Sequence, residues 1–275
     1  MEHLGRRYQA LSWGPRDGPK VLALHGWLDN AASFAVLAPL LPGYHIVAVD
    51  LPGHGLSPHR NDCTYHITDY VFDVLCAARG LGWEQFNLLG HSLGAGIATL
   101  VAGAFAERVR KLVLIEGLGP LSAPVDAVPI ALAQAWKKMA VLASKAPPSY
   151  ASFDEAVRAR ARGGSGLRED AARLLCERGL QERDGRWFWR SDARLTLPSA
   201  QRLTEAQVLA FLTAITAPVL VVRASAGPEF DEQILKSRAA AVRDLTLRYA
   251  QGGHHVHMEK NADEVAREIS HHLVS

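Results

Sequence analysis

Cysteine is scarce in this 275-residue chain, which has Cys63, Cys76 and Cys176 and no others. No two of them have the C-x-x-C spacing typical of a zinc or redox site. Three scattered cysteines are also too few for a disulfide framework. The sequence therefore excludes a disulfide-stapled scaffold and favours a reducing compartment.

The chain also lacks an excess of either charge and any long hydrophobic run. Lys and Arg number 30 against 28 Asp and Glu, which gives a formal net charge of +2 and indicates no nucleic-acid partner. No run of about 18 apolar residues occurs, and residues 1–14 have no apolar core of a signal peptide. We therefore expect a cytoplasmic protein without a membrane partner, monomeric or homodimeric, and we expect no cofactor.

Short apolar segments that end in polar residues or glycine recur along the chain. We interpret these as strands of a buried sheet, at residues 20–26, 44–50, 86–92, 111–117, 217–225 and 245–250. Segments with helical periodicity lie between or after them, at residues 31–41, 68–82, 93–109 and 262–273. This alternation predicts an α/β fold with a doubly wound, mostly parallel sheet.

The alternation stops between residues 120 and 216. This stretch has mainly polar or Ala-rich helical patterns, a Trp-Phe-Trp segment at 187–189, and no comparably apolar strand pattern. We predict a core domain formed by residues 1–119 and 217–275, with a mostly helical cap at 120–216 inserted between two core strands. Such an insertion would lie at the carboxyl edge of the sheet, where open α/β sheets hold their sites.

The segment Gly90-His91-Ser92-Leu93-Gly94 matches G-x-S-x-G, with a predicted strand before it and a predicted helix after it. In that context the serine lies on a sharp turn and projects into the cleft as a nucleophile. The glycines then permit strained backbone and close packing. The alternative is a tight turn in which Ser92 only caps the helix.

A serine hydroxyl is a weak nucleophile and needs a base, and the loop Gln251 to Glu259 offers three histidines. We choose His254, which follows a glycine pair that frees its ring from the strand end, and place His255 and His257 around it. An H-H-x-H pattern also occurs in metal sites. No companion Cys or carboxylate cluster at recognisable spacing accompanies it here, so we predict no metal.

The acid that orients the base is harder to locate. The segment after the strand at 217–225 has no early acid, and its nearest candidates are Glu229 and Asp231. Glu116 ends a very apolar strand next to the one that carries Ser92, where an unused carboxylate would be costly. We therefore assign the acid to Glu116, with Asp231 and Glu229 as fallbacks. A structural ion pair is the other interpretation of Glu116.

Two backbone amides are predicted to form an oxyanion hole: that of Leu93, directly after the nucleophile, and that of Trp27 in the loop after the first core strand. We expect His25 to hold this loop by a hydrogen bond. Trp27, His91 and Trp136 are expected to contact the substrate. Phe153, Trp187 and Trp189 are further possible pocket residues of the cap, although each is individually more typical of a cap core.

The segments H-G-W, D-L-P-G-H-G-L-S, G-H-S-L-G and G-G-H-H-V-H-M-E, in this order, resemble the α/β-hydrolase superfamily along nearly the whole chain except the insertion. H-G-W-L-D-N-A-A-S-F together with L-P-G-H-G-L-S is similar to its serine hydrolase-like proteins. The resemblance implies a triad with Ser92 and His254 and an insertion that acts as a cap.

The chain departs from the family's usual pattern at the acid, which normally follows the strand at 217–222. Some capped members, such as the haloalkane dehalogenases, carry it after the preceding strand, where Glu116 lies. Their nucleophile is an aspartate, so Ser92 argues against dehalogenase chemistry.

These residues predict a serine hydrolase that cleaves a carboxylic ester or similar small acyl substrate through an acyl-enzyme. Within enzymes the alternatives are carbon-carbon bond hydrolysis of a β-diketone by the same triad, or haloperoxidase-type side chemistry without a cofactor. Outside enzymes the alternative is a ligand-binding or regulatory protein with a vestigial triad.

Overall fold

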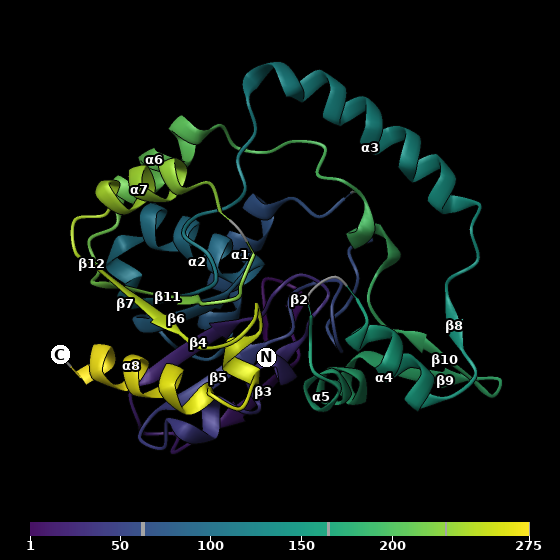
Figure 1. The fold of residues 1–275 in the computed structure, drawn as a ribbon, viewed down its shortest axis with the longest axis horizontal. Helices are drawn as coiled ribbons and strands as arrows, with labels where there is room; N and C mark the ends of the chain where they lie inside the picture. Colours follow the sequence, from purple (N-terminus) through teal and green to yellow (C-terminus); the bar gives the residue numbers. More distant parts are fainter. Residues whose placement is uncertain (62–63, 164–165, 229, 275) are drawn as a thin grey trace.

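Seven strands form the central sheet of the computed structural model, which describes residues 1–61, 64–163, 166–228 and 230–274 (Figure 1). Their order is β12-β11-β7-β6-β4-β5-β3, and all neighbours pair in parallel except β3, which is antiparallel to β5. The strands are β3 (Ala10–Trp13), β4 (Lys20–Leu24), β5 (His45–Val49), β6 (Phe86–His91), β7 (Val109–Ile115), β11 (Val219–Ala224) and β12 (Leu245–Ala250). This confirms the predicted mostly parallel α/β sheet.

Helices cover both faces of the sheet, which explains why its central strands are continuous apolar runs. Every residue of β6 and of β11 is buried. One face packs against α1 (Ile67–Gly80), α2 (Leu93–Ala104), α6 (Glu205–Ala214) and α7 (Glu232–Ala241), and the other against α8 (Ala262–Val274) and the 3-10 helix Ala31–Phe34. The two faces form separate hydrophobic clusters on either side of the sheet.

Residues 31–41 differ from the predicted α-helix. They form two short 3-10 helices, Ala31–Phe34 and Ala38–Leu40. Pro39 lacks an amide hydrogen and its ring would clash with the carbonyl of Ala35 in a continuous α-helix, so one long helix is disfavoured. A small hairpin of β1 (Glu2–His3) and β2 (Arg6–Arg7) near the start of the chain was also not expected.

The insertion between β7 and β11 contains a small sheet beside its helices, which was not predicted. It contains α3 (Val128–Ala143), α4 (Phe153–Ala161) and α5 (Glu169–Gly179), together with an antiparallel sheet in the order β8-β10-β9. The strands of that sheet are β8 (Ser149–Tyr150), β9 (Leu180–Arg183) and β10 (Arg186–Trp189). The Trp-Phe-Trp segment lies in β10, the middle strand.

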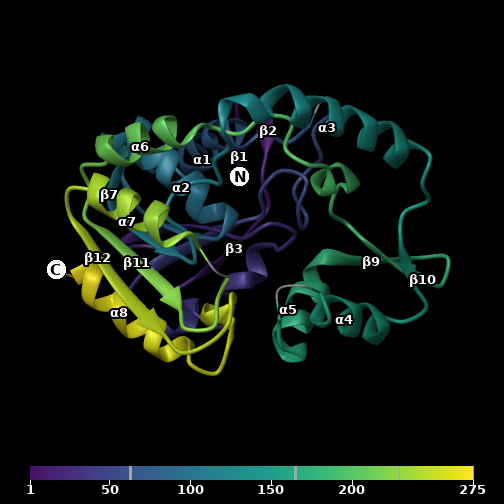
Figure 2. The same ribbon diagram turned by 45° about the horizontal axis from the view of Figure 1, so that its top comes forward.

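Helix α6 belongs structurally to the core, although the predicted boundary at residue 216 placed it in the cap. Its Val208 and Leu212 are fully buried in the same hydrophobic cluster as α1 and α2. The part that stands apart from the core therefore ends before α6. In Figures 1 and 2 this part, from α3 to β10, lies beside the carboxyl end of the central sheet. Helix α3 connects the core side of the ribbon with the side that holds α4, α5 and the small sheet.

Polar contacts hold the insertion to the core. The guanidinium of Arg178 on α5 pairs with the fully buried carboxylate of Asp50 after β5, with an Nη2–Oδ2 distance of 2.9 Å. Asn30 donates a hydrogen bond to the carbonyl of Leu175, and Trp27 donates one from Nε1 to the carbonyl of Leu195. Within the described ranges, no helix is long and apolar enough to cross a membrane.

Candidate active site

Ser92 lies on a strained turn between β6 and α2. Its backbone angles are φ +51° and ψ −112°, in a region that residues with a side chain rarely adopt. The two glycines of the motif are required by close packing: a Cβ atom at Gly90 would overlap the Gly94 carbonyl, and one at Gly94 would overlap the Leu24 carbonyl. The sequence therefore forms the sharp turn that lifts the Ser92 side chain to the carboxyl edge of the sheet.

The structure brings Ser92, His254 and Glu116 together from three separate strand ends. His254 Nε2 lies 3.0 Å from Ser92 Oγ, and His254 Nδ1 lies 3.2 Å from Glu116 Oε2. Because an ionised carboxylate only accepts hydrogen bonds, Nδ1–H donates to Glu116. In the neutral ring Nε2 is then free to accept the proton of the Ser92 hydroxyl.

Glu116 is held rigidly by its second oxygen. Oε1 accepts hydrogen bonds from the Ala224 amide at 2.7 Å and from Arg223 Nε at 3.0 Å, which leaves Oε2 for His254. Glu116 is 2% exposed and has a φ of +55°. Both interpretations of Glu116 therefore hold geometrically, because one carboxylate makes the ion pair and contacts the histidine.

Two residues around Glu116 were missed by sequence reasoning. Arg223 is the residue before the last of β11, is buried, and lies over the Phe230 ring with its Cζ atom 3.9 Å from the centroid. Gly227 lies in the loop where the family's usual acid is absent, and a Cβ there would overlap Glu116 Oε2 and come within 2.8 Å of Cδ. The signals were a charged residue inside an apolar strand and a glycine in the loop that follows this strand.

The fallback acids do not contact the histidine. Asp231 is exposed and caps α7, where its Oδ1 accepts hydrogen bonds from the amides of Gln233 and Ile234. Glu229 lies outside the described residues. Within the described part of the chain, the carboxylate that contacts His254 is that of Glu116.

A group of buried histidines surrounds the loop that carries His254. His91 Nε2 donates a hydrogen bond to the His254 carbonyl at 2.9 Å and so supports the backbone of the candidate base. Burial, reinforced by the neighbouring imidazoles, holds the pKa of His91 well below its usual range. Burial, together with His255, also lowers the pKa of His257 to about 3. These two rings are therefore neutral near pH 7.

Asp29 lies next to this group, after β4. Its Oδ2 lies 3.1 Å from His255 Nε2 and 3.7 Å from His91 Nδ1, and its Oδ1 accepts a hydrogen bond from Arg160 of the cap at 2.7 Å. Burial alone would raise the pKa of Asp29, but His255 and Arg160 hold it well below the usual range. Asp29 is therefore ionised. Among the residues that the structure describes, Asp29, His91 and His255 form a group of side chains that could hold a metal ion.

The loop of the predicted oxyanion hole is fixed by His25, as expected. His25 Nδ1–H donates to the Gly26 carbonyl at 2.8 Å, and Nε2 accepts from the Leu51 amide at 3.0 Å. Trp27 follows in this loop, and Leu93 is the first residue of α2, where amide hydrogens have no partner within the helix. Both amides lie at the sheet edge that carries Ser92, because β4 and β6 are neighbours. Their role as an oxyanion hole stays a prediction.

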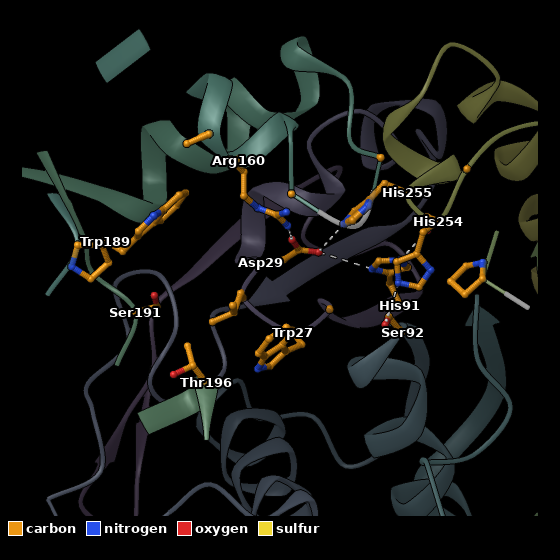
Figure 3. A pocket seen from close by; sticks show the side chains of 18 of the residues that line it. Trp27, Asp29, His91, Ser92, Arg160, Trp189, Ser191, Thr196, His254 and His255 are labelled. Carbon is orange, nitrogen blue, oxygen red and sulfur yellow. Dashed lines mark hydrogen bonds and ion pairs between the residues drawn. The ribbon is translucent and has the colours of Figure 1, made fainter. Parts of the chain in front are cut away.

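A cavity of about 1060 Å³ lies between the core and the cap, and Ser92 and His254 line one end of it (Figure 3). Trp27 and His91 line it too, and their contact with a substrate stays a prediction. Trp189, Ser191 and Thr196 of the insertion lie away from Ser92, across the pocket. Apolar side chains form much of the remaining wall: Leu28, Leu142, Pro147, Pro148, Ala159, Ala226 and Pro228.

The aromatic residues of the insertion lie in three different environments: solvent, the packed interior of the insertion, and the cavity wall. Trp136 is 71% exposed on α3 and is not among the residues that line this cavity, so its expected contact with the substrate stays a prediction without support from the cavity. A helical segment of this kind gives no sequence signal for which of its faces meets the cavity. Phe153 and Trp187 pack edge to face within the cap, with ring centroids 5.1 Å apart. Trp189, by contrast, lines the cavity.

The fold and this constellation define an α/β hydrolase. A family model described as alpha/beta hydrolase fold matches residues 19–261, and the chain belongs to that family. It is 32% identical over 269 residues to a serine hydrolase-like protein of Dictyostelium discoideum, covering 92% of this chain and 75% of that one. These relationships support a hydrolase.

Solved structures agree with this assignment. A hypothetical protein from Pseudomonas aeruginosa PAO1 shares 42% sequence identity, with a TM-score of 0.91 and 100% of both chains covered. A thioesterase domain from the curacin biosynthetic pathway shares 25% identity, with a TM-score of 0.84, and the match covers 98% of this chain and 97% of that one.

Proposed function

We propose that this protein is a serine hydrolase that cleaves a carboxylic ester or thioester through an acyl-enzyme on Ser92. The observation that carries the proposal is the continuous chain of contacts from Ser92 Oγ through both nitrogens of His254 to Glu116, at 3.0 and 3.2 Å, at the end of a cavity. Nucleophile, base and orienting acid within hydrogen-bond reach are the geometry that acyl transfer requires.

In the first half of the reaction, Ser92 Oγ attacks the acyl carbon while its proton moves to His254 Nε2. Glu116 stabilises the imidazolium that forms. The amides of Trp27 and Leu93 stabilise the negative oxygen of the tetrahedral intermediate. Collapse of that intermediate breaks the bond to the leaving alcohol or thiol, which takes the proton from His254. Water then attacks the acyl-enzyme by the same steps, releases the carboxylic acid and restores Ser92.

The shape of the cavity supports an acyl group longer than acetyl. Its volume of about 1060 Å³ lies at the upper end of the range for drug-sized ligands, roughly 300–1,000 Å³. Its wall beyond Ser92 is largely apolar, with Leu142, Pro148 and Trp189 contributed by the insertion. An apolar acyl chain that runs from Ser92 toward Trp189 would bury its methylenes there, each worth about 0.8 kcal/mol.

Steady-state kinetics on p-nitrophenyl esters from acetate to decanoate, with matching acyl thioesters, tests the proposal. We expect kcat/KM to rise with chain length and Ser92→Ala to lower kcat by roughly 10⁶. A β-diketone is included as a competing substrate class. Consumption of the diketone with no turnover of any ester would favour carbon-carbon bond hydrolysis. No turnover of either class, together with an unreactive Ser92, would favour a binding protein.

A further inference from the structure

Three buried side chains meet beside the candidate triad without belonging to it. Asp29 follows β4, His91 ends β6 and His255 follows β12, and one ligand atom from each lies within 4.8 Å of the others. All three side chains are at most 3% exposed, and all three residues belong to the wall of the cavity. Figure 3 shows them converging around the Asp29 carboxylate.

The hydrogen-bond pattern of His91 leaves one nitrogen of this cluster with a lone pair that accepts no hydrogen bond. His91 Nε2 contacts the carbonyl oxygen of His254, which can only accept, so Nε2 carries the hydrogen. In the neutral ring His91 Nδ1 is then a bare lone pair. This atom is buried, has no hydrogen-bond partner among the described residues, and faces Asp29 Oδ2 at 3.7 Å. Two acceptors that face each other in a buried site repel, and a cation between them would remove the repulsion.

The spacing of these atoms suits a small metal ion. Zinc binds imidazole nitrogen and carboxylate oxygen at about 2.0–2.2 Å, so two ligands of one ion lie roughly 3–4 Å apart. The distances from Asp29 Oδ2 to His255 Nε2 and to His91 Nδ1 are 3.1 and 3.7 Å. To bind an ion, His255 Nε2 gives up its hydrogen, which Nδ1 of the same ring can carry instead.

The surroundings leave room for the ion and orient the ligands. A Cβ atom at residue 26 would lie 2.9 Å from His91 Nδ1 and 3.0 Å from Asp29 Oδ2, so the glycine keeps the space beside both atoms open. Arg160 donates to the other oxygen of Asp29, and the His254 carbonyl accepts from the far nitrogen of His91. Outer hydrogen bonds of this kind hold metal ligands in position in known sites.

We propose that Asp29, His91 and His255 form a binding site for one divalent transition-metal ion of the zinc type in the wall of the cavity. The two imidazoles and one carboxylate supply three ligands, and the fourth position faces the cavity. This proposal does not depend on the proposed ester hydrolysis, because metal binding is measured without turnover.

Titration of the full-length, metal-free protein with Co²⁺ tests the site, because tetrahedral Co²⁺ bound by histidine absorbs visible light. We expect one ion per chain in the wild type and a Kd weakened by about 100-fold or more in Asp29→Asn and in His255→Gln. His257→Gln is the matched control, since that ring lies 4.3 Å from the His91 ring but is outside the ligand set. It should bind Co²⁺ with unchanged affinity.

Circular dichroism and thermal melting of each variant separate loss of a ligand from loss of the fold. A crystal of the wild type soaked in Zn²⁺ provides a second test that needs no variant. Anomalous scattering should locate the ion about 2.0–2.2 Å from Asp29 Oδ2, His91 Nδ1 and His255 Nε2. Equal Co²⁺ binding in folded Asp29→Asn and wild type, or an ion found only on surface histidines, would overturn the proposal.

Discussion

Replacement of Glu116 by Gln tests the orientation of the candidate base, and the structure determines which way the new amide must face. The carboxylate oxygen Oε1 accepts from two donors, the Ala224 amide and Arg223 Nε. The carbonyl oxygen of the glutamine therefore has to take this position. Its NH₂ group then takes the place of Oε2, 3.2 Å from His254 Nδ1.

An NH₂ group at that position donates to Nδ1, which reverses the tautomer of His254. The hydrogen then lies on Nε2, and the ring cannot accept the proton of Ser92. A reversed tautomer in a serine triad lowers kcat by about 10⁴. At 1.36 kcal/mol per factor of ten, this is about 5.4 kcal/mol of transition-state stabilisation.

The assay is kcat for a p-nitrophenyl ester, measured well below the melting temperature of each variant. Loss of the charge beside the buried Arg223 should also destabilise the fold, at most by the roughly 3–5 kcal/mol typical of a broken buried ion pair. Asp231→Asn is the matched control and should keep full activity, because Asp231 is exposed and only caps α7. A folded Glu116→Gln protein with kcat within tenfold of the wild type would refute the reasoning.

Three further predictions concern the surroundings of the site. Gly227→Ala should lower kcat at least tenfold with little change in KM, because the new methyl group displaces the hydrogen-bonded Glu116 carboxylate. Gly43→Ala is the control and should leave kcat unchanged, because a Cβ atom at residue 43 meets no atom within 4 Å. The folded-state pKa of His257, about 3, lies below the unfolded value near 6.5, so the unfolded state binds the extra proton between these values. The protonation of His257 should therefore lower the free energy of unfolding by about 1.4 kcal/mol per pH unit below pH 6.5. Denaturant titrations from pH 7 to 5 should show a smaller decrease in the free energy of unfolding for His257→Gln than for the wild type. An equal decrease in both proteins would contradict the lowered pKa of His257. Arg178→Ala should lower the free energy of unfolding by about 3–5 kcal/mol in the same titrations, because it leaves Asp50 buried without its ion-pair partner. Arg168→Ala, at an exposed pair, should have a much smaller effect, and equal effects would show that Arg178 and Asp50 do not form a stable pair.

The core of the fold could be predicted because its signals are local. Parallel strands buried on both faces have largely apolar sequences, and every residue of the strands at 86–91 and 219–224 is buried. The positions of Ser92, Glu116 and His254 followed from the same rule. Ser92 and Glu116 come directly after a strand, His254 lies in the loop that follows β12, and the carboxyl ends of parallel strands share one edge.

The features that the sequence did not predict depend on contacts between distant parts of the chain. The cap sheet pairs only two residues of β8 with β10, too few to give an alternating pattern in the sequence. Whether α6 belongs to the core or the cap is decided by its packing on α2, and the exposure of Trp136 depends on how α3 is placed. The contact between Arg223 and Glu116 joins residues 107 positions apart, so neither residue reveals the other locally.

The most direct test of the account is covalent labelling with a fluorophosphonate, followed by peptide mass spectrometry. The reagent reacts with a serine whose proton can be withdrawn. The account predicts a single adduct on Ser92, formed at least 100-fold more slowly in folded His254→Gln. Labelling of a different serine, or equal labelling of Ser92 with and without the His254 ring, would contradict the claim that these two residues act together.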